Sequence, residues 1–179
     1  MSNEFDYFVT LTLDKAKFDR YNLKEYIKKL GQFLRDMRKK YNSNIQYLLI
    51  PEQHKDGAWH MHGLIKGIPR EVLTLNNNNY LDWKDYSDRF GYISLSEIRD
   101  KLAVSKYITK YVTKELGKGI DKESKLYYVS RGLNKAVKIK EGTLSEIEHI
   151  NIPWRYENEY IKSIDMNAEE LEEILKLIK

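Results

Sequence analysis

Two histidines separated by a single residue, His60 and His62, are the first side chains in this chain that could bind a metal ion. Side chains alternate between the two faces of a β-strand, so both imidazoles would lie on one face and Met61 on the other. Neutral imidazoles placed side by side are good ligands for a divalent cation. The pair alone is weak evidence, because a half-exposed strand also carries histidines as ordinary polar residues.

The histidines belong to the second strand of a predicted β-hairpin. Residues 45–52 and 58–66 are rich in apolar strand-forming residues, and residues 55–57 (Lys-Asp-Gly) lie between them. A three-residue loop with glycine in the left-handed conformation is a common hairpin turn. We therefore predict a hairpin that closes with His54 opposite Ala58.

This register brings a carboxylate to the histidines. It pairs Glu52 with His60 and Ile50 with His62, and directly paired residues share one face of a sheet. Glu52 and both imidazoles would then lie together, with His54 at the rim. A two-residue Asp-Gly loop would shift the register by one position and turn Glu52 away, so the prediction depends on the loop.

One carboxylate and two imidazoles leave coordination positions open for water or a substrate. Such a set suits Mg²⁺ or Mn²⁺ acting as a Lewis acid better than a closed four-ligand zinc site. We therefore expect a divalent metal cofactor, Mg²⁺ or Mn²⁺, bound by Glu52, His60 and His62.

A second chemical pattern lies in a predicted helix over about residues 100–116, where Tyr-apolar-Thr-Lys occurs twice, four residues apart. Residues four apart are neighbours on a helix, so Tyr107 and Tyr111 form one stripe. The adjacent stripe consists of lysines: Lys106, Lys110 and Lys114. A phenol with its ordinary pKa of about 10 is a weak nucleophile, and nearby cations favour its phenolate. Two phenols beside lysines suit a phosphodiester, although tyrosines at a core edge beside solvated lysines would give the same pattern.

Other elements must position these motifs. Residues 5–13 read as a strand with two apolar-looking faces, which indicates a central position in a sheet. Its Thr10 and Thr12 either line a polar site or serve only as good strand formers. An amphipathic covering helix is predicted over residues 23–41 with Asn22 as its cap. Further strands are predicted over 91–98 and 126–131.

Charge is distributed unevenly along the 179 residues, whose net charge is +4. Residues 101–140 contain 11 lysines and arginines against three acidic residues, whereas residues 141–179 contain four basic and ten acidic ones. A basic middle in a chain with 14 tyrosines indicates a polyanion with stackable bases. A solvated helix face is the alternative explanation of the charge run.

The length predicts one domain over residues 1–140, followed by an acidic segment over 141–179. A short amphipathic helix at about 168–178 is expected to pack on the domain or on a partner. The absence of cysteine excludes disulfides and thiolate metal sites. No long apolar segment and no signal-peptide pattern is present, so we expect a cytoplasmic protein without a membrane partner.

Taken in order, these motifs resemble the HUH endonuclease superfamily, and more narrowly the rolling-circle replication initiators (Rep proteins) of small phages and plasmids. The resemblance spans about residues 5–133. It is carried by a first strand motif, a metal motif, a nucleophile motif and a downstream strand of the phage and plasmid branch, at residues 8–13, 51–62, 107–114 and 127–133. The metal and tyrosine motifs in this order are the specific part.

The resemblance implies an α+β fold: a central antiparallel β-sheet, related to the RNA-recognition-motif topology, with flanking helices. It places the metal hairpin centrally and the tyrosine helix across the metal-binding face. It also implies a metal-dependent DNA endonuclease and strand transferase. In such enzymes the metal polarises the scissile phosphate of single-stranded DNA, and a tyrosine attacks it to leave a 5′-phosphotyrosine link and a free 3′-hydroxyl.

Tyr107 and Tyr111 have the spacing of the two alternating nucleophiles of microviral initiators, whereas single-tyrosine members use one. A lysine follows each tyrosine by three residues, and these are assigned to the catalytic group: Lys110 and Lys114. The basic side chains assigned to DNA binding are Lys106, Arg131 and Lys135.

The expected partners are single-stranded or origin DNA together with a host helicase and polymerase, because the sequence contains no Walker phosphate loop. Two alternatives remain open. One is a transposase of the same superfamily, and the other is a single-stranded nucleic-acid-binding module without catalysis. Relaxases place their tyrosine ahead of the histidines, so the order of motifs argues against them.

Overall fold

The computed structural model describes residues 3–76, 80–116, 125–135, 151–157, 162–164 and 166–177. The chain divides into two compact units, Met1–Lys135 and Ala136–Lys179. The first unit contains one seven-stranded sheet with the strand order β4-β5-β6-β1-β3-β2-β7, and every neighbouring pair is antiparallel. This confirms the predicted α+β fold with a central antiparallel sheet.

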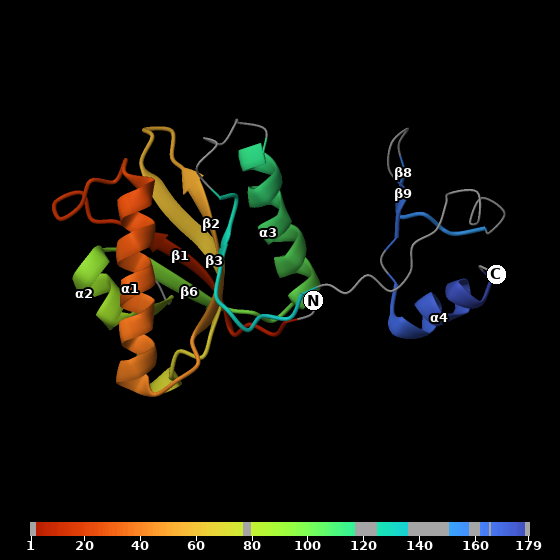
Figure 1. Ribbon diagram of the computed structural model, residues 1–179, viewed down its shortest axis with the longest axis horizontal. Helices are drawn as coiled ribbons and strands as arrows, with labels where there is room; N and C mark the ends of the chain where they lie inside the picture. The colour runs from red at the N-terminus through yellow and green to blue at the C-terminus, as the bar shows by residue number, and fades with distance from the viewer. Residues whose placement is uncertain are drawn as a thin grey trace. The chain divides into compact units, whose positions relative to one another are not determined.

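The elements of the first unit follow one another in a simple order (Figure 1). Its strands are β1 (Tyr7–Thr12), β2 (Gln46–Gln53), β3 (Trp59–Lys66), β4 (Leu73–Leu75), β5 (Leu81–Trp83), β6 (Ile93–Glu97) and β7 (Tyr128–Val129). Its helices are α1 (Leu23–Tyr41), the 3₁₀ turn η1 (Arg70–Val72), α2 (Lys84–Phe90) and α3 (Lys101–Leu116).

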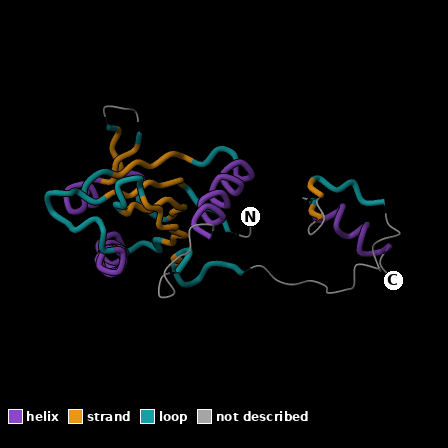
Figure 2. Tube along the Cα trace, turned by 90° about the horizontal axis from the view of Figure 1, so that it is seen from above, coloured by secondary structure: helices purple, strands orange, loops and turns teal. Residues whose placement is uncertain are grey.

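Helices cover both faces of this sheet. Figures 1 and 2 show α1 and α2 on one side of the strands and α3 on the other. The larger core lies on the α1 side, where Phe33 makes ring contacts with Trp83, Tyr86 and Phe90. A smaller core lies under α3 and consists of Ile50, Leu64, Ile108 and Tyr111.

Helix α1 begins and ends where the sequence predicts. The Asn22 side chain accepts a hydrogen bond from the Glu25 backbone N–H at 3.0 Å, which satisfies one of the unpaired donors of the first turn. At the other end, Asn42 adopts a left-handed conformation with φ of 49° and closes the last turn. The buried side chains recur at three- and four-residue steps: Leu23, Tyr26, Leu30, Phe33 and Leu34.

Strand β1 is the fourth of the seven strands, which confirms its predicted central position. Val9 and Leu11 are buried in the core under α1, whereas the alternating Phe8 packs against the cluster under α3. Three elements were not predicted: β4, β5 and α2. Each of these strands has only three residues, which is too few to show an alternating pattern.

In the second unit, the described residues form a two-stranded ladder of β8 (Tyr156–Glu157) and β9 (Lys162–Ser163), and helix α4 (Ala168–Leu177). Asn167 and Glu170 cap α4 reciprocally, with hydrogen bonds of 2.9 and 2.8 Å between each side chain and the other's backbone N–H. The predicted helix is therefore present, and its packing against the domain or a partner stays a prediction. No helix in the described part of the chain is long and apolar enough to span a membrane.

Candidate metal and tyrosine site

The hairpin of β2 and β3 has the predicted register. Glu52 stands opposite His60, and Ile50 stands opposite His62. The backbone N–H of His54 donates to the Ala58 carbonyl at 2.9 Å, which closes a three-residue loop. Gly57 in this loop has a φ of 85°, a conformation that favours glycine because it has no Cβ.

Gly63, the residue after the second histidine, allows the two strands to lie close together. A Cβ at this position would lie 2.1 Å from the Leu48 carbonyl oxygen and 2.7 Å from a Leu49 methyl carbon. Any larger side chain would push β2 away from β3. Gly63 therefore helps to hold Glu52 beside His62, a role that sequence analysis did not identify.

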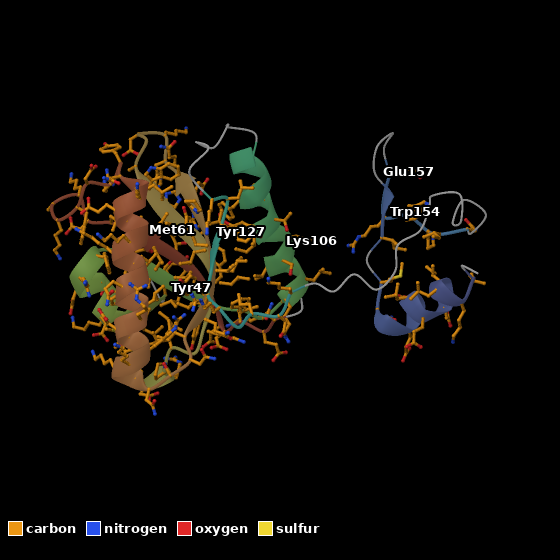
Figure 3. The ribbon with its side chains drawn as sticks, viewed as in Figure 1. Tyr47, Met61, Lys106, Tyr127, Trp154 and Glu157 are labelled. Atoms are coloured by element: carbon orange, nitrogen blue, oxygen red, sulfur yellow. The ribbon has the colours of Figure 1, made fainter. Side chains whose placement is uncertain are left out.

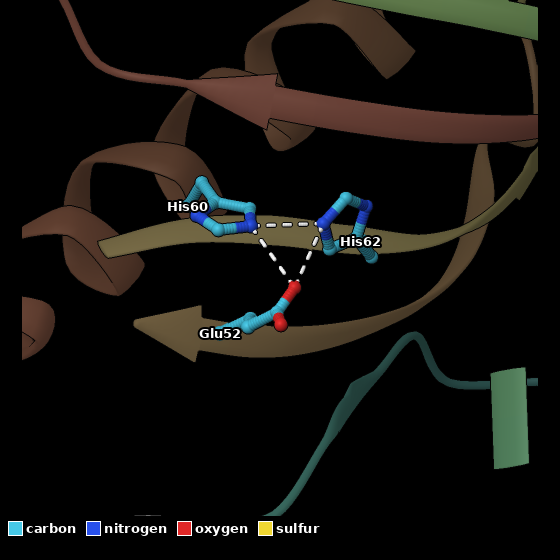
Figure 4. A group of neighbouring side chains, drawn as sticks. All are labelled: Glu52, His60 and His62. Atoms are coloured by element: carbon cyan, nitrogen blue, oxygen red, sulfur yellow. Dashed lines mark hydrogen bonds and ion pairs between the residues drawn. The ribbon is translucent and has the colours of Figure 1, made fainter. Parts of the chain in front are cut away.

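The three predicted metal ligands meet in space (Figure 4). The Nε2 atoms of His60 and His62 are 2.8 Å apart, and Glu52 Oε2 lies 3.1 Å from the first and 3.0 Å from the second. Glu52 and His60 are 7% and 4% exposed, so this triangle forms the floor of the site. Among the described residues, these three are the group that could hold a metal ion.

The size of the triangle fits a divalent ion. Ligand bonds of about 2.1 Å at right angles, as in octahedral Mg²⁺ coordination, place neighbouring donor atoms about 3.0 Å apart. The three donors would then occupy one face of the octahedron, and the opposite face would be left for water or substrate. This agrees with the expectation of a divalent metal cofactor held by one carboxylate and two imidazoles.

The environment keeps His62 in the form that binds metals. Burial, and then the neighbouring His60, lower the pKa of His62 to about 4, although Glu52 opposes this shift. His62 is therefore neutral at pH 7, as a metal ligand must be. Its Nδ1 lies 3.1 Å from Thr10 Oγ1 on β1. With Nε2 facing the other donors, Nδ1 carries the proton and donates it to Thr10, which orients the ring.

Helix α3 brings the tyrosines to this site. The Tyr111 ring stacks on the His62 ring with centroids 4.4 Å apart, and its hydroxyl donates to the Tyr107 hydroxyl at 2.6 Å. Tyr111 is 9% exposed and Tyr107 is 46% exposed. Burial, followed by the hydrogen bond to Tyr107, raises the pKa of Tyr111 well above its ordinary value. Phe8 supports both motifs, because it stacks on His62 and makes an edge contact with Tyr107.

Comparison with known families places the chain. The sequence model of a family of replication-associated proteins, described as the ORF2 type, matches residues 6–116, more than half of the chain. The chain belongs to this family of replication-associated proteins. The matched region runs from β1 to α3 and includes the metal triangle and both tyrosines. No match was found among curated proteins or among solved structures.

For a member of a replication-associated family, the position of basic side chains matters, because such a protein would bind DNA. Lys106 and Lys110 are exposed on α3, and Figure 3 labels Lys106 there. Lys114 lies on the same helix, but its side chain is outside the described part of the structure. These positions place two of the predicted lysines within two turns of the tyrosine pair.

Arg131 and Lys135 lie elsewhere on this replication-associated protein. The Arg131 carbonyl accepts a hydrogen bond from the Gln46 side chain at 3.1 Å, so it lies near the start of β2. Glu52 is six residues further along that strand, a distance of about 20 Å. Both basic side chains are exposed, and the structure does not bring them to the metal triangle.

His54 lies beside the triangle without belonging to it. It is exposed, and its ring centroid is 4.1 Å from that of His60. This agrees with the predicted place at the rim. The residues that sequence analysis did not assign to the site are Phe8, which the alternation of β1 could have indicated, and Gly63.

Proposed function

We propose that this replication-associated protein is an HUH-type endonuclease that nicks and rejoins single-stranded DNA at a replication origin, and so initiates rolling-circle replication. The observation that supports this best is the contact between the two motifs. The Tyr111 ring stacks on the imidazole of His62, so a nucleophilic pair lies beside a triad that fits a divalent ion. Each motif alone has an ordinary structural explanation, whereas their meeting in a replication family favours chemistry on DNA.

Glu52, His60 and His62 would hold Mg²⁺ or Mn²⁺. When bound, the ion supplies Lewis-acid polarisation of the scissile phosphate. The protein contributes neutral imidazoles, a buried carboxylate and the hydrogen bond from His62 to Thr10 that keeps one ring in position.

Tyr107 is the better placed of the two phenols for the first attack. It is the more exposed, and its oxygen accepts the hydrogen bond from Tyr111. That bond becomes stronger as negative charge develops on the Tyr107 oxygen, because charge-assisted hydrogen bonds are about twice as strong as neutral ones. Tyr111 thereby stabilises the phenolate of its neighbour.

The reaction exchanges one phosphate ester for another. The Tyr107 oxygen forms a bond to the phosphorus of the scissile phosphodiester as its proton passes to solvent, and the bond from phosphorus to the 3′ oxygen breaks. The 3′ oxygen takes up a proton and leaves as a free 3′-hydroxyl, while the 5′ phosphate stays on the tyrosine. A later hydroxyl, from a 3′ end or from Tyr111, reverses the exchange and transfers the strand.

The basic residues would guide the DNA. Lys106 and Lys110 are exposed on α3 near the tyrosines, where they would neutralise the phosphates on either side of the cleaved bond. Lys114 would extend this line along the helix. Arg131 and Lys135, at the far end of β2, would contact a more distant part of the strand.

A covalent trapping experiment tests this proposal. The protein is incubated with labelled single-stranded origin DNA and either Mn²⁺ or EDTA, and denaturant-resistant adducts are separated by electrophoresis. We expect a Mn²⁺-dependent adduct that falls strongly in Tyr107→Phe, falls less in Tyr111→Phe and disappears in the double variant.

The control is Tyr127→Phe, which alters an exposed tyrosine outside α3 and should leave the adduct unchanged. An adduct lost in Tyr111→Phe but retained in Tyr107→Phe would reverse the assigned roles. Tight DNA binding without any adduct, with either Mg²⁺ or Mn²⁺, would contradict the nuclease and favour a non-catalytic binding module.

A further inference from the structure

We infer that Tyr92 stacks on a nucleobase of single-stranded DNA beside the metal triangle, on the side of the site away from α3. The inference rests on the proposed function, because it places the strand on which that function acts. It concerns an exposed tyrosine at the start of β6 that the proposed reaction does not use.

Strand register places Tyr92 in one row with the metal ligands. Leu11 stands opposite Ile93, and the next backbone N–H, that of Thr12, donates to the Tyr92 carbonyl at 2.9 Å. Thr12 therefore stands opposite Tyr92 on one side and opposite His60 on the other. His60 in turn stands opposite Glu52, so the row continues across four strands.

All members of this row point to the same face of the sheet, because directly paired residues share a face. The neighbour Ile93 is 2% exposed and lies in the core under α1, which turns Tyr92 toward the face of the metal triangle. Tyr92 is 51% exposed. Two strand spacings separate it from His60, a distance of about 10 Å.

The surface between Tyr92 and the metal ligands suits a nucleotide. Thr12 in the same row, and Ser94 opposite Thr10 in the next, are half-buried and offer hydroxyls that bond phosphate or sugar oxygens. The apolar cluster under α3 includes residues of β1, β2 and β3 but none of these three polar or aromatic side chains. A strand whose scissile phosphate lies at the metal triangle can therefore place its next base against the Tyr92 ring.

A binding measurement without metal tests this inference separately from cleavage. The probe is a fluorescein-labelled oligothymidylate strand of about 16 nucleotides, the upper range of site sizes for related single-strand-binding folds. Anisotropy is measured in EDTA for the full chain. We expect Tyr92→Ala to weaken binding by about 5- to 150-fold, the effect of losing one stacked base, and Tyr92→Phe and Tyr92→Trp to bind within about twofold of the unaltered chain.

Tyr80→Ala is the matched control. Tyr80 is 46% exposed and lines a pocket with Leu75, Leu81 and Leu95 at the far edge of the sheet. Its loss should leave binding unchanged. Tyr92→Trp adds a direct readout, because its indole fluorescence should be quenched by oligothymidylate beyond the change shown by the three native tryptophans.

Three results would overturn the inference: equal binding by Tyr92→Ala, equal losses in Tyr92→Ala and Tyr92→Phe, or no binding by the unaltered chain. The adduct assay separates the two proposals. An adduct that forms while Tyr92→Ala binds normally removes the stacking role and leaves the nuclease. Tyr92-dependent binding without any adduct removes the nuclease and leaves a stacking surface for single strands.

Discussion

The two faces of the seven-stranded sheet do different work. The face under α1 and α2 is covered by the larger apolar core, which is centred on Phe33 and its aromatic neighbours. The face under α3 has a cluster of four buried apolar residues and, next to it, a buried carboxylate and two imidazoles. Apolar burial on the first face supplies stability, so the second face can accept polar groups that burial would otherwise penalise.

The same strands build both faces by alternation. On β3, Met61 is buried under α1, while His60 and His62 on either side of it form the metal triangle. On β1, Val9 enters the larger core and Thr10 contacts His62. A one-residue change of register would therefore destroy stability and chemistry together. Substitutions at single positions should separate them.

The largest expected effect is on the α1 face. Phe33→Ala removes a side chain that is 1% exposed and contacts three aromatic rings, so unfolding free energy should fall by about 3–5 kcal/mol. Urea unfolding followed by circular dichroism measures this change. At temperatures where the variant remains folded, its Mn²⁺ affinity should match that of the unaltered chain. A weaker metal site in the folded variant would show that the two faces are coupled.

The next effect belongs to the α3 face. His62→Ala removes one of three metal ligands and should lower Mn²⁺ affinity by more than about 100-fold, since loss of a supporting group alone costs about 10- to 100-fold. Isothermal titration calorimetry measures the affinity. Stability without metal should change by less than about 1 kcal/mol, because the histidine contributes little apolar burial. An unchanged affinity would exclude His62 as a ligand.

How far the sequence predicts each face depends on the range of the interactions. The hairpin register followed from a three-residue loop, and the bounds of α1 followed from its caps and its apolar spacing, because both are set by neighbours in the chain. The contact between Thr10 and His62 joins residues 52 positions apart, and no local pattern specifies the register between β1 and β3. Thr10 could therefore be seen only as a strand former or part of a polar site.

The charged residues show the same limit. The basic composition of residues 101–140 indicated a polyanion but did not indicate where each side chain lies. Lys106 and Lys110 share α3 with the tyrosines, whereas Arg131 lies at the other end of β2 because its carbonyl is held by Gln46. Elements too short to have a period, such as β4 and β5, were missed for a related reason.

A smaller effect is expected where β1 supports the metal ligand. Thr10→Val keeps the shape of the side chain but removes the acceptor at 3.1 Å from His62 Nδ1, so Mn²⁺ affinity should fall by about tenfold. Thr10→Ser retains the hydroxyl and should keep most of the affinity. Calorimetry compares the two variants, and thermal unfolding should show only a small difference between them. Equal affinities in both would mean that packing, not the hydrogen bond, orients His62.

The smallest effect returns to the α1 side, where Asp85 of α2 accepts hydrogen bonds from Lys40 and Tyr41 at the end of α1. Burial alone would raise the pKa of Asp85, but the hydrogen bonds from Lys40 and Tyr41 outweigh it and hold the pKa below its usual range. A carboxyl group whose pKa is lower in the folded state stabilises the fold above its unfolded pKa of about 3.9, and this contribution is lost as pH falls below that value. Asp85→Asn should therefore lower stability at pH 7 by less than about 1 kcal/mol, because the pair is partly solvated, and should flatten the loss of stability below about pH 4.

Urea unfolding as a function of pH measures this slope, with Tyr41→Phe as the partner variant, since it removes one of the two donors and should reduce the slope by less than Asp85→Asn does. An acid slope that stays the same in both variants would assign the acid sensitivity to other carboxylates. Glu52 is then the group to test, because its buried carboxylate lies on the opposite face between two imidazoles. Comparing Asp85→Asn with Glu52→Gln would show which face of the sheet first loses its structure in acid.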